Sequence, residues 1–186
     1  MNSFWQGRRV RLRGVEPEDW ESLLRFGAEE EGLGDLLHPP RSAESYRAGA
    51  KERSEAKPDG DWFQLIVEAA ESGEAVGSVL VYAADARGGA FRYGVTIAAE
   101  HRGRGYATEA VVMLLRFMFA ERRFHKCEAH VFAHNERSLA FHRRLGFVEE
   151  GRLREHLFVG GEYGDLAIVG MLADEFARAH GMSAPG

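Results

Sequence analysis

Residues 101–110, HRGRGYATEA, combine glycines and arginines in a spacing that suits a pyrophosphate group. Gly103 and Gly105 have no Cβ, so the backbone there can adopt positive φ values and bring its N–H groups close to phosphate oxygens. Arg102 and Arg104 can add charge-assisted hydrogen bonds to the same anion. The alternative is a strand-to-helix turn whose arginines only solvate it. Because the loop has neither G-x-G-x-x-G nor a Gly-Lys-Ser/Thr ending, Rossmann and P-loop sites are excluded.

The residues that flank this loop predict a strand that leads into a helix. FRYGVTIAA, at the end of a predicted strand over 89–99, is rich in β-branched and aromatic residues, and 107–122 has a helical apolar stripe. The first turn of such a helix presents unpaired N–H groups and the positive end of the helix dipole. We therefore add Tyr106, Ala107 and Thr108 to the predicted anion-binding residues. Tyr106 has two open roles, stacking on the ligand or packing.

The order Arg102-Gly-Arg-Gly105-Tyr-Ala107 resembles the R/Q-x-x-G-x-G/A acetyl-CoA loop of the GNAT acetyltransferase superfamily. Residues 135–172 resemble the second half of the branch that acetylates protein N-termini, the RimJ/RimL-like ribosomal-protein alanine acetyltransferases and their relatives. The matching residues are Asn135, Ser138, Gly146, Phe147, Glu150, Gly151, Arg154, Gly161 and Asp165. The resemblance is most specific over 93–172. It implies an acetyl-CoA-dependent N-acetyltransferase that acts by direct attack in a ternary complex.

Alternating elements without a linker or repeat predict a single domain over 1–186. The fold implied is α/β (α+β): a mixed, mostly antiparallel sheet of six to seven strands, flanked by helices and splayed between the fourth and fifth strands. Strands are predicted at 8–15, 61–69, 75–84, 89–99, 126–134, 148–159 and 163–172. Helices are predicted after Glu16-Pro17-Glu18-Asp19 and at 42–55, 107–122 and 138–146, and residues 177–186 are predicted to form a frayed tail.

The resemblance also implies further contacts with acetyl-CoA. In the superfamily the acyl arm pairs with the fourth strand, here near Val95, Thr96 and Ile97, where backbone N–H groups can polarise the thioester carbonyl. Asn135 corresponds to a residue near the pantetheine arm, and Ser138 lies on the helix beside the cofactor. Asn135 also has a structural interpretation, as the N-cap of that helix.

Acetyl transfer needs a deprotonated amine and a proton for the leaving thiolate. His142 occupies the place where the superfamily often has an acidic Tyr. An imidazolium, with a pKa of about 6.5 against about 8.5 for a thiol, can donate that proton downhill. The alternative is a surface residue beside Arg143 and Arg144, whose charges disfavour protonation.

The sequence identifies the general base less directly than the acid. Where the superfamily often places a Glu at the start of the fourth strand, this chain has Phe91, Arg92 and Tyr93. Glu128 is the candidate base, with Asp165 and an ordered water as alternatives. Glu128 and Asp165 also have a structural interpretation, as turn or rim residues. Glu109, one turn into the helix after the loop, is interpreted as a helix stabiliser, since an acid there suits the helix dipole.

Composition and charge exclude several other classes of protein. A net charge of −5 over 186 residues argues against general nucleic-acid binding, which needs a basic face. No segment is long and apolar enough for a membrane span, and the N-terminal residues do not form a secretory signal. A lone Cys127 fits a reducing compartment, so we expect a cytoplasmic protein without a membrane partner. His125, His130 and His134 form no compact ligand set, so no metal is expected.

The predicted acceptor is a primary amine, and the resemblance favours a protein or peptide N-terminus. Residues 29–59 and the hairpin around Gly160 are expected to select it, since cofactor geometry constrains them least. Small amines such as polyamines, antibiotics and amino acids remain alternatives, because they use the same scaffold. A non-catalytic acyl-CoA-binding regulatory protein is a further one. The expected oligomeric state is a monomer or a homodimer.

Overall fold

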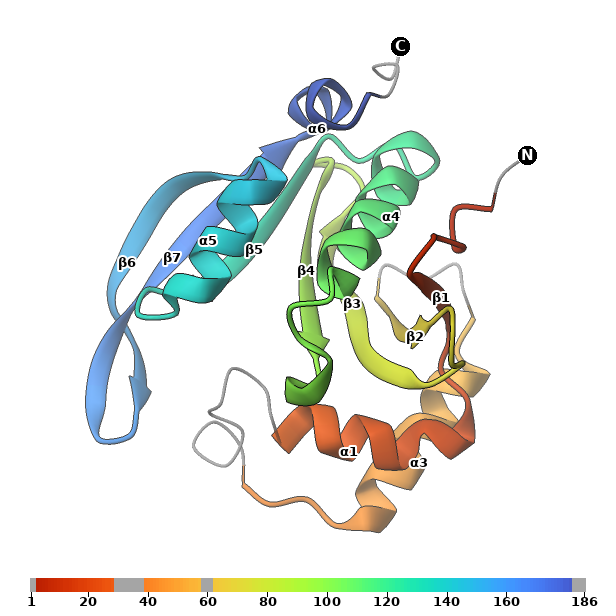
Figure 1. Ribbon diagram of the computed structural model, residues 1–186. Coiled ribbons are helices and arrows are strands. Elements are labelled where there is room, and N and C mark those ends of the chain that lie inside the picture. Colours follow the sequence, from red (N-terminus) through yellow and green to blue (C-terminus); the bar gives the residue numbers. More distant parts are fainter. Residues whose placement is uncertain (1–2, 29–38, 58–61, 182–186) are drawn as a thin grey trace. The chain divides into compact units, whose positions relative to one another are not determined.

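The computed structural model describes residues 3–28, 39–57 and 62–181. The chain divides into two compact units, Met1–Tyr82 with Gly94–Leu114 and Ala83–Tyr93 with Leu115–Gly186. Strand β3 (Ala75–Asp85), strand β4 (Ala90–Ile97) and helix α4 (Tyr106–Ala120) contribute residues to both (Figure 1).

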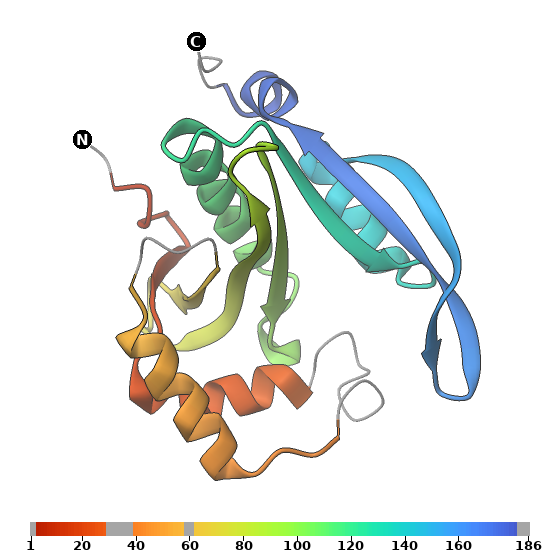
Figure 2. The same cartoon turned by 180° about the vertical axis from the view of Figure 1, so that it is seen from behind.

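The first unit is built on an antiparallel sheet with helices packed beside it. Strands β1 (Val10–Gly14), β2 (Phe63–Ala69) and β3 pair in order, with Val10 opposite Ala69 and Phe63 opposite Val81. After a 3-10 turn, η1 (Pro17–Asp19), come helices α1 (Trp20–Ala28) and α3 (Ala43–Glu55), which lie side by side (Figure 1, Figure 2). Their apolar residues join the sheet in one cluster: Val15, Leu23, Phe26, Ala50, Ile66 and Ala98.

The second unit contains a parallel strand pair. Residues Ala90–Arg92 of β4 lie parallel to Lys126–Glu128 of β5 (Lys126–Phe132). Strand β5 then pairs antiparallel with β7 (Glu162–Leu172), and β7 pairs antiparallel with β6 (Val148–Val159). Helix α5 (Glu136–Leu145) buries Leu139 and Leu145.

The hydrogen-bonded strand order, β1-β2-β3-β4-β5-β7-β6, confirms a mixed sheet of seven strands. Among the described residues, the β4–β5 register ends at Arg92 and Glu128, although β4 continues to Ile97. The splay between these strands, which the resemblance implied, stays a prediction.

Most element bounds agree with the sequence, but the C-terminal tail and the end of β4 differ from the prediction. Residues Ala177–His180 do not fray, because helix α6 (Ala173–His180) buries Phe176 and Ala177 and ends at Gly181 in the left-handed conformation. Phe176 packs on Phe119 with ring centroids 5.4 Å apart, which anchors this end of the chain. A short 3-10 turn, η3 (Ala99–His101), also follows β4 where the sequence suggested further strand.

Candidate active site

The predicted anion-binding loop lies in the first unit, between η3 and the start of α4. Gly103 and Gly105 have φ values of +78° and +80°, in the left-handed region that favours glycine. Both are exposed, as are Arg104 and Thr108, whereas Tyr106 is half-buried. Since the first N–H groups of α4 lack intrahelical acceptors by geometry, this segment has the donors that an anion needs.

The two loop arginines hold the loop's own backbone. The Nε atom of Arg102 donates to the carbonyl of Ile97, the last residue of β4, at 2.9 Å. The Nη2 atom of Arg104 lies 3.4 Å from the carbonyl of Glu100. These bonds connect the loop to the end of the strand that precedes it, so the arginines also position the peptide groups of the predicted anion-binding loop.

Glu109 does more than favour the helix dipole. Its carboxylate accepts the backbone N–H groups of Arg8, Arg9 and Val10 at 3.0, 2.6 and 2.8 Å. The Nη1 atom of Arg9 in turn donates to the carbonyl of Arg104 at 2.6 Å. The segment before β1 is thus bonded both to the first turn of α4 and to the loop. Sequence reasoning missed Arg9, because no local spacing links it to residues about a hundred positions away.

The strand residues predicted to meet the acyl arm lie at the end of β4. Val95 and Thr96 are half-buried, and Ile97 is buried. A Cβ on Gly77 of β3 would clash with the carbonyl oxygen of Thr96, so the two backbones approach closely there only because residue 77 is glycine. This close approach fixes the position of β4, the strand that leads into the loop, relative to β3.

Asn135 has the capping role that the sequence allowed. Its Oδ1 atom accepts the backbone N–H of Ser138 at 3.0 Å, which caps the first turn of α5. The helix ends at Gly146, with φ of +102°, as predicted. The carbonyl of Ser138 is also used, since it accepts from Nδ1 of His142 at 2.8 Å. Roles for Asn135 and Ser138 toward the cofactor stay predictions.

His142 is not the surface residue of the alternative interpretation, because only 5% of it is exposed. Its Nδ1 must carry the proton that reaches the carbonyl of Ser138, so Nε2 is an acceptor for the hydroxyl of Tyr93 at 2.9 Å. Burial lowers the pKa of His142, and its hydrogen bond to Ser138 offsets only part of that effect. The neutral imidazole is therefore favoured near neutral pH.

Both candidate bases, Glu128 and Asp165, have polar partners in the second unit. The Glu128 carboxylate lies 3.2 Å from Nε of Arg92, its partner in the β4–β5 register, and 3.7 Å from Nζ of Lys126. The Oδ1 atom of Asp165 accepts the backbone N–H of Glu155 at 2.9 Å. Since Glu155 has a positive φ of 50° at an irregularity of β6, Asp165 stabilises that bend.

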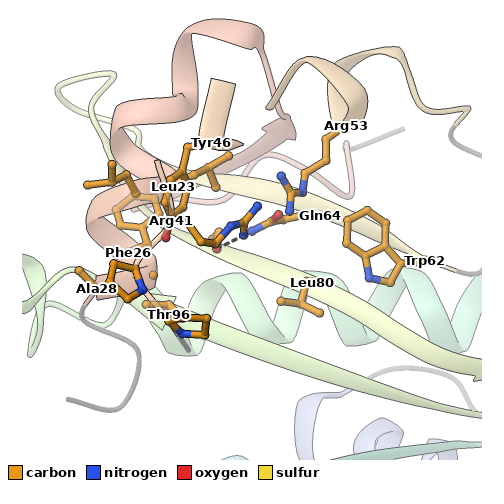
Figure 3. Close-up of a pocket in the computed structure, with 15 residues that line it drawn as sticks. Leu23, Phe26, Ala28, Arg41, Tyr46, Arg53, Trp62, Gln64, Leu80 and Thr96 are labelled. Carbon is orange, nitrogen blue, oxygen red and sulfur yellow. Dashed lines mark hydrogen bonds between the residues drawn. The ribbon is translucent and has the colours of Figure 1, made fainter. Parts of the chain in front are cut away.

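A pocket of about 520 Å³ lies in the first unit, lined by residues of α1, α3, β2, β3 and β4. Its apolar lining includes Leu23, Phe26, Trp62 and Leu80, and its neutral polar lining includes Gln64, Ser78 and Thr96 (Figure 3). Of the described residues that line it, only Arg41 and Arg53 are charged. Thr96 connects the pocket to the strand that ends at the loop. Residues 29–38 and 58–61, within the segment predicted to select the acceptor, lie outside the described residues.

Comparison with known proteins identifies the family to which this chain belongs. Residues 9–148 match the profile of the acetyltransferase (GNAT) domain, a range that includes β1, the loop and α5. The chain belongs to the GNAT acetyltransferase family. It is an acetyl-CoA-dependent acetyltransferase, and the family predicted from the loop is confirmed.

Individual relatives of this GNAT acetyltransferase differ in their acceptors. The chain is 33% identical to the N-acetyltransferase YokL of the SPbeta prophage in Bacillus subtilis, over 96% of this chain and 98% of that one. It is 29% identical to YdaF of Bacillus subtilis, a putative ribosomal N-acetyltransferase, over 90% and 93% of the two chains. The fold also matches spermidine N-acetyltransferase of Vibrio cholerae, solved with CoA and spermine, with a TM-score of 0.79, 23% identity and coverage of 91% and 99%.

Two further features concern cofactors and membranes. Within residues 3–28, 39–57 and 62–181, no group of three His, Cys, Asp or Glu side chains is arranged to hold a metal ion. No helix in the same part of this GNAT chain is long and apolar enough to cross a membrane.

Proposed function

We propose that this GNAT enzyme transfers the acetyl group of acetyl-CoA to the α-amine of a protein or peptide N-terminus. The observation that carries the cofactor half is the pair of left-handed glycines, Gly103 and Gly105, at the start of α4. The acceptor half is supported by similarity over nine-tenths of the chain to a putative ribosomal N-acetyltransferase.

In the proposed reaction both substrates are bound together. The N–H groups of the loop and of the first turn of α4 hold the pyrophosphate, and the backbone near Val95, Thr96 and Ile97 receives the acyl arm. The amine nitrogen attacks the thioester carbonyl, the C–S bond breaks, the nitrogen loses one proton and the thiolate gains one. Placement of the amine supplies a large part of the rate, because the attack becomes intramolecular.

His142 is the proposed acid, and Glu128 or an ordered water is the proposed base. The hydrogen bonds to Tyr93 and to the carbonyl of Ser138 hold the imidazole ring, so Nε2 must exchange its bond with Tyr93 for one with the thiolate when it donates. Because the pKa of His142 is lowered, the charged form that donates to the thiolate is populated mainly in mild acid. This requirement makes the assignment testable by pH dependence.

A small amine is the second candidate acceptor. The similarity in fold to a spermidine acetyltransferase favours it, and the same scaffold serves both acceptor classes. A cytoplasmic location is also part of the proposal, supported by the free, buried thiol of Cys127.

The experiment that tests the proposed function measures free thiol release from acetyl-CoA against a panel of N-terminal peptides, polyamines, aminoglycosides and amino acids. We expect release that depends on a peptide acceptor, with the acetyl group found on its α-amine by mass spectrometry. Turnover of polyamines alone would replace the peptide by the second candidate. Tight acetyl-CoA binding without turnover on any acceptor would contradict catalysis.

A further inference from the structure

The pocket in the first unit brings two guanidinium groups to one lining. Arg41 lies just before the N-cap of α3, and Arg53 lies in the last turn of that helix. Figure 3 shows both side chains directed toward Gln64 of β2. No carboxylate occurs among the described lining residues. The described part of the pocket is therefore cationic.

Neither guanidinium group forms a salt bridge with a carboxylate among the described residues. Arg41 donates from Nε and Nη2 to the hydroxyl of Ser45, at 3.2 and 3.1 Å, and stacks over Tyr46. Arg53 stacks over Trp62, with its guanidinium carbon 5.7 Å from the ring centroid. Its Nε atom is buried and has no hydrogen-bond partner in the described part of the chain. The aromatic rings orient both groups but supply no negative charge.

Other arginines of the same unit lie close to carboxylates. Arg11 and Arg13 are paired with Glu68, and Arg25 lies 3.5 Å from a Glu100 oxygen. By contrast, burial lowers the pKa of Arg53, the positive charge of Arg41 lowers it further, and the negative charge of Glu52 offsets only part of this effect. Two like charges on one pocket lining are electrostatically unfavourable, and Arg53 is partly buried whereas Arg41 is exposed. An anion bound between them relieves that repulsion.

We propose that this pocket receives a carboxylate of the acceptor, so that the enzyme prefers peptides with Asp or Glu close to the N-terminal amine. The inference rests on the proposed function, since it assumes that the acceptor approaches β4, where Thr96 lines the same pocket. Guanidinium groups suit carboxylates because they form charge-assisted, often bidentate, hydrogen bonds.

The same charges disfavour a polycationic acceptor. A polyamine in this pocket would place ammonium groups beside Arg41 and Arg53, and like charges repel. The pocket thus discriminates between the two acceptor classes that relatives of this chain suggest.

The test compares peptides that are identical except for one residue near the N-terminus, which is Glu, Gln or Lys. We expect kcat/KM to be about 10- to 100-fold higher for the Glu peptide than for the Gln peptide, and lowest for Lys. Raised salt should reduce the preference. Equal rates for the Glu and Gln peptides would overturn the anionic subsite while leaving the proposed function intact.

Variants locate the preference. Arg53→Gln and Arg41→Gln should lower kcat/KM for the Glu peptide to about that of the Gln peptide, without changing the KM for acetyl-CoA. Arg47→Gln is the matched control, because Arg47 lies on the same helix but stacks on Trp20 and does not line the pocket. Thermal unfolding of each variant checks that α3 is intact. A preference that survives both pocket substitutions would place the anion elsewhere and overturn the proposal.

Binding of reaction products gives an answer that needs no turnover. With CoA present, calorimetry measures the affinity for acetylated Glu and Gln peptides and for free N-acetylglutamate. Tighter binding of the Glu peptide, lost in Arg53→Gln, supports a peptide carboxylate. Equally strong, Arg53-dependent binding of N-acetylglutamate supports the carboxylate subsite but identifies a free amino acid as its source. No preference for either anion would rule out the subsite, whether or not the peptides are turned over.

Discussion

The hydroxyl oxygen of Tyr93 lies 2.9 Å from Nε2 of His142, and both residues are almost fully buried. The opposite nitrogen of the ring bonds the carbonyl of Ser138. The ring is thus fixed from β4 on one side and from within α5 on the other. Since this arrangement favours the neutral imidazole, a catalytic His142 has a measurable signature.

We predict that His142→Gln lowers kcat by about 100-fold, a usual contribution of a general acid. The pKa of His142 in the folded parent enzyme is below 6.5, so the charged imidazolium is lost as pH rises through that lowered value. The kcat of the parent enzyme at saturating acceptor should therefore show a limb that falls with rising pH below about 6.5. That limb should disappear in the variant.

Tyr93→Phe is the control for this assignment, because it removes the hydroxyl that faces Nε2 but keeps the ring that packs on Phe147. We expect the falling limb to move to higher pH. The neutral imidazole loses the hydrogen bond from the hydroxyl, so the pKa of His142 rises. If His142→Gln and the parent enzyme have superimposable pH–rate profiles, His142 has a packing role alone.

Replacing Gly105 by Val should abolish measurable acetyl-CoA binding. Its φ of +80° is strained for any L side chain, and a Cβ would lie 2.9 Å from Nη1 of Arg9. The branched side chain also blocks the approach of phosphate oxygens to the backbone. Gly73→Ala is the matched control, since φ there is +72° with open space around it and the turn lies outside the loop. Calorimetry with acetyl-CoA should show unchanged affinity for the control, and unchanged affinity for Gly105→Val would remove the pyrophosphate assignment.

Stability in acid should depend on Arg13, which bridges Asp19 and Glu68 at 2.7 Å each. Burial raises the pKa of both carboxyl groups, but hydrogen bonds from Arg13, and from the Glu16 backbone to Asp19 or from Arg11 to Glu68, outweigh it and lower both pKa values overall. Their stabilisation is therefore present above the unfolded pKa values of about 4 and is lost as pH falls through the lowered folded values.

Arg13→Met should consequently cost about 3 kcal/mol of unfolding free energy at pH 7, because it leaves the buried Asp19 without its cationic partner. The difference from the parent protein should shrink below about pH 4, once the carboxyl groups are protonated. Urea unfolding at several pH values measures both. A difference that is constant from pH 7 to pH 3 would show that packing, not charge, determines the loss.

The sequence predicts what short-range chemistry determines. Asn135 at the start of α5 and Gly146 at its end act within one turn of the helix, so residue type and spacing sufficed to place them. The loop glycines are similar, because their conformation is a property of the residue itself. The overall family followed from the same local signals.

Contacts between distant segments were not predictable in this way. The burial of His142 depends on Tyr93, 49 residues earlier, and the cationic pocket brings Arg41 and Arg53 to strands that come later in the chain. Helix α6 was missed because its apolar stripe, Phe176 with Ala173 and Ala177, is too short to stand out beside a polar tail. In each case tertiary packing supplies the information that the local pattern lacks.

Glu109 provides the strongest test of how the loop is held, since its carboxylate accepts three backbone N–H groups of residues 8–10. Glu109→Gln replaces one acceptor oxygen by a donor, which faces an N–H group that it cannot bond. We expect a loss of about 1–3 kcal/mol in unfolding free energy. Because Arg9 also bonds the carbonyl of Arg104, acetyl-CoA affinity should fall as well, by about tenfold.

Arg9→Ala separates the two effects, because it removes the bond to the loop but leaves the three N–H groups on Glu109. It should weaken acetyl-CoA binding with little change in thermal stability. Glu71→Gln, at an exposed turn, is the charge-matched control and should alter neither property. If Glu109→Gln unfolds at a lower temperature but binds acetyl-CoA with parental affinity, the N-terminal segment stabilises the unit without shaping the cofactor loop.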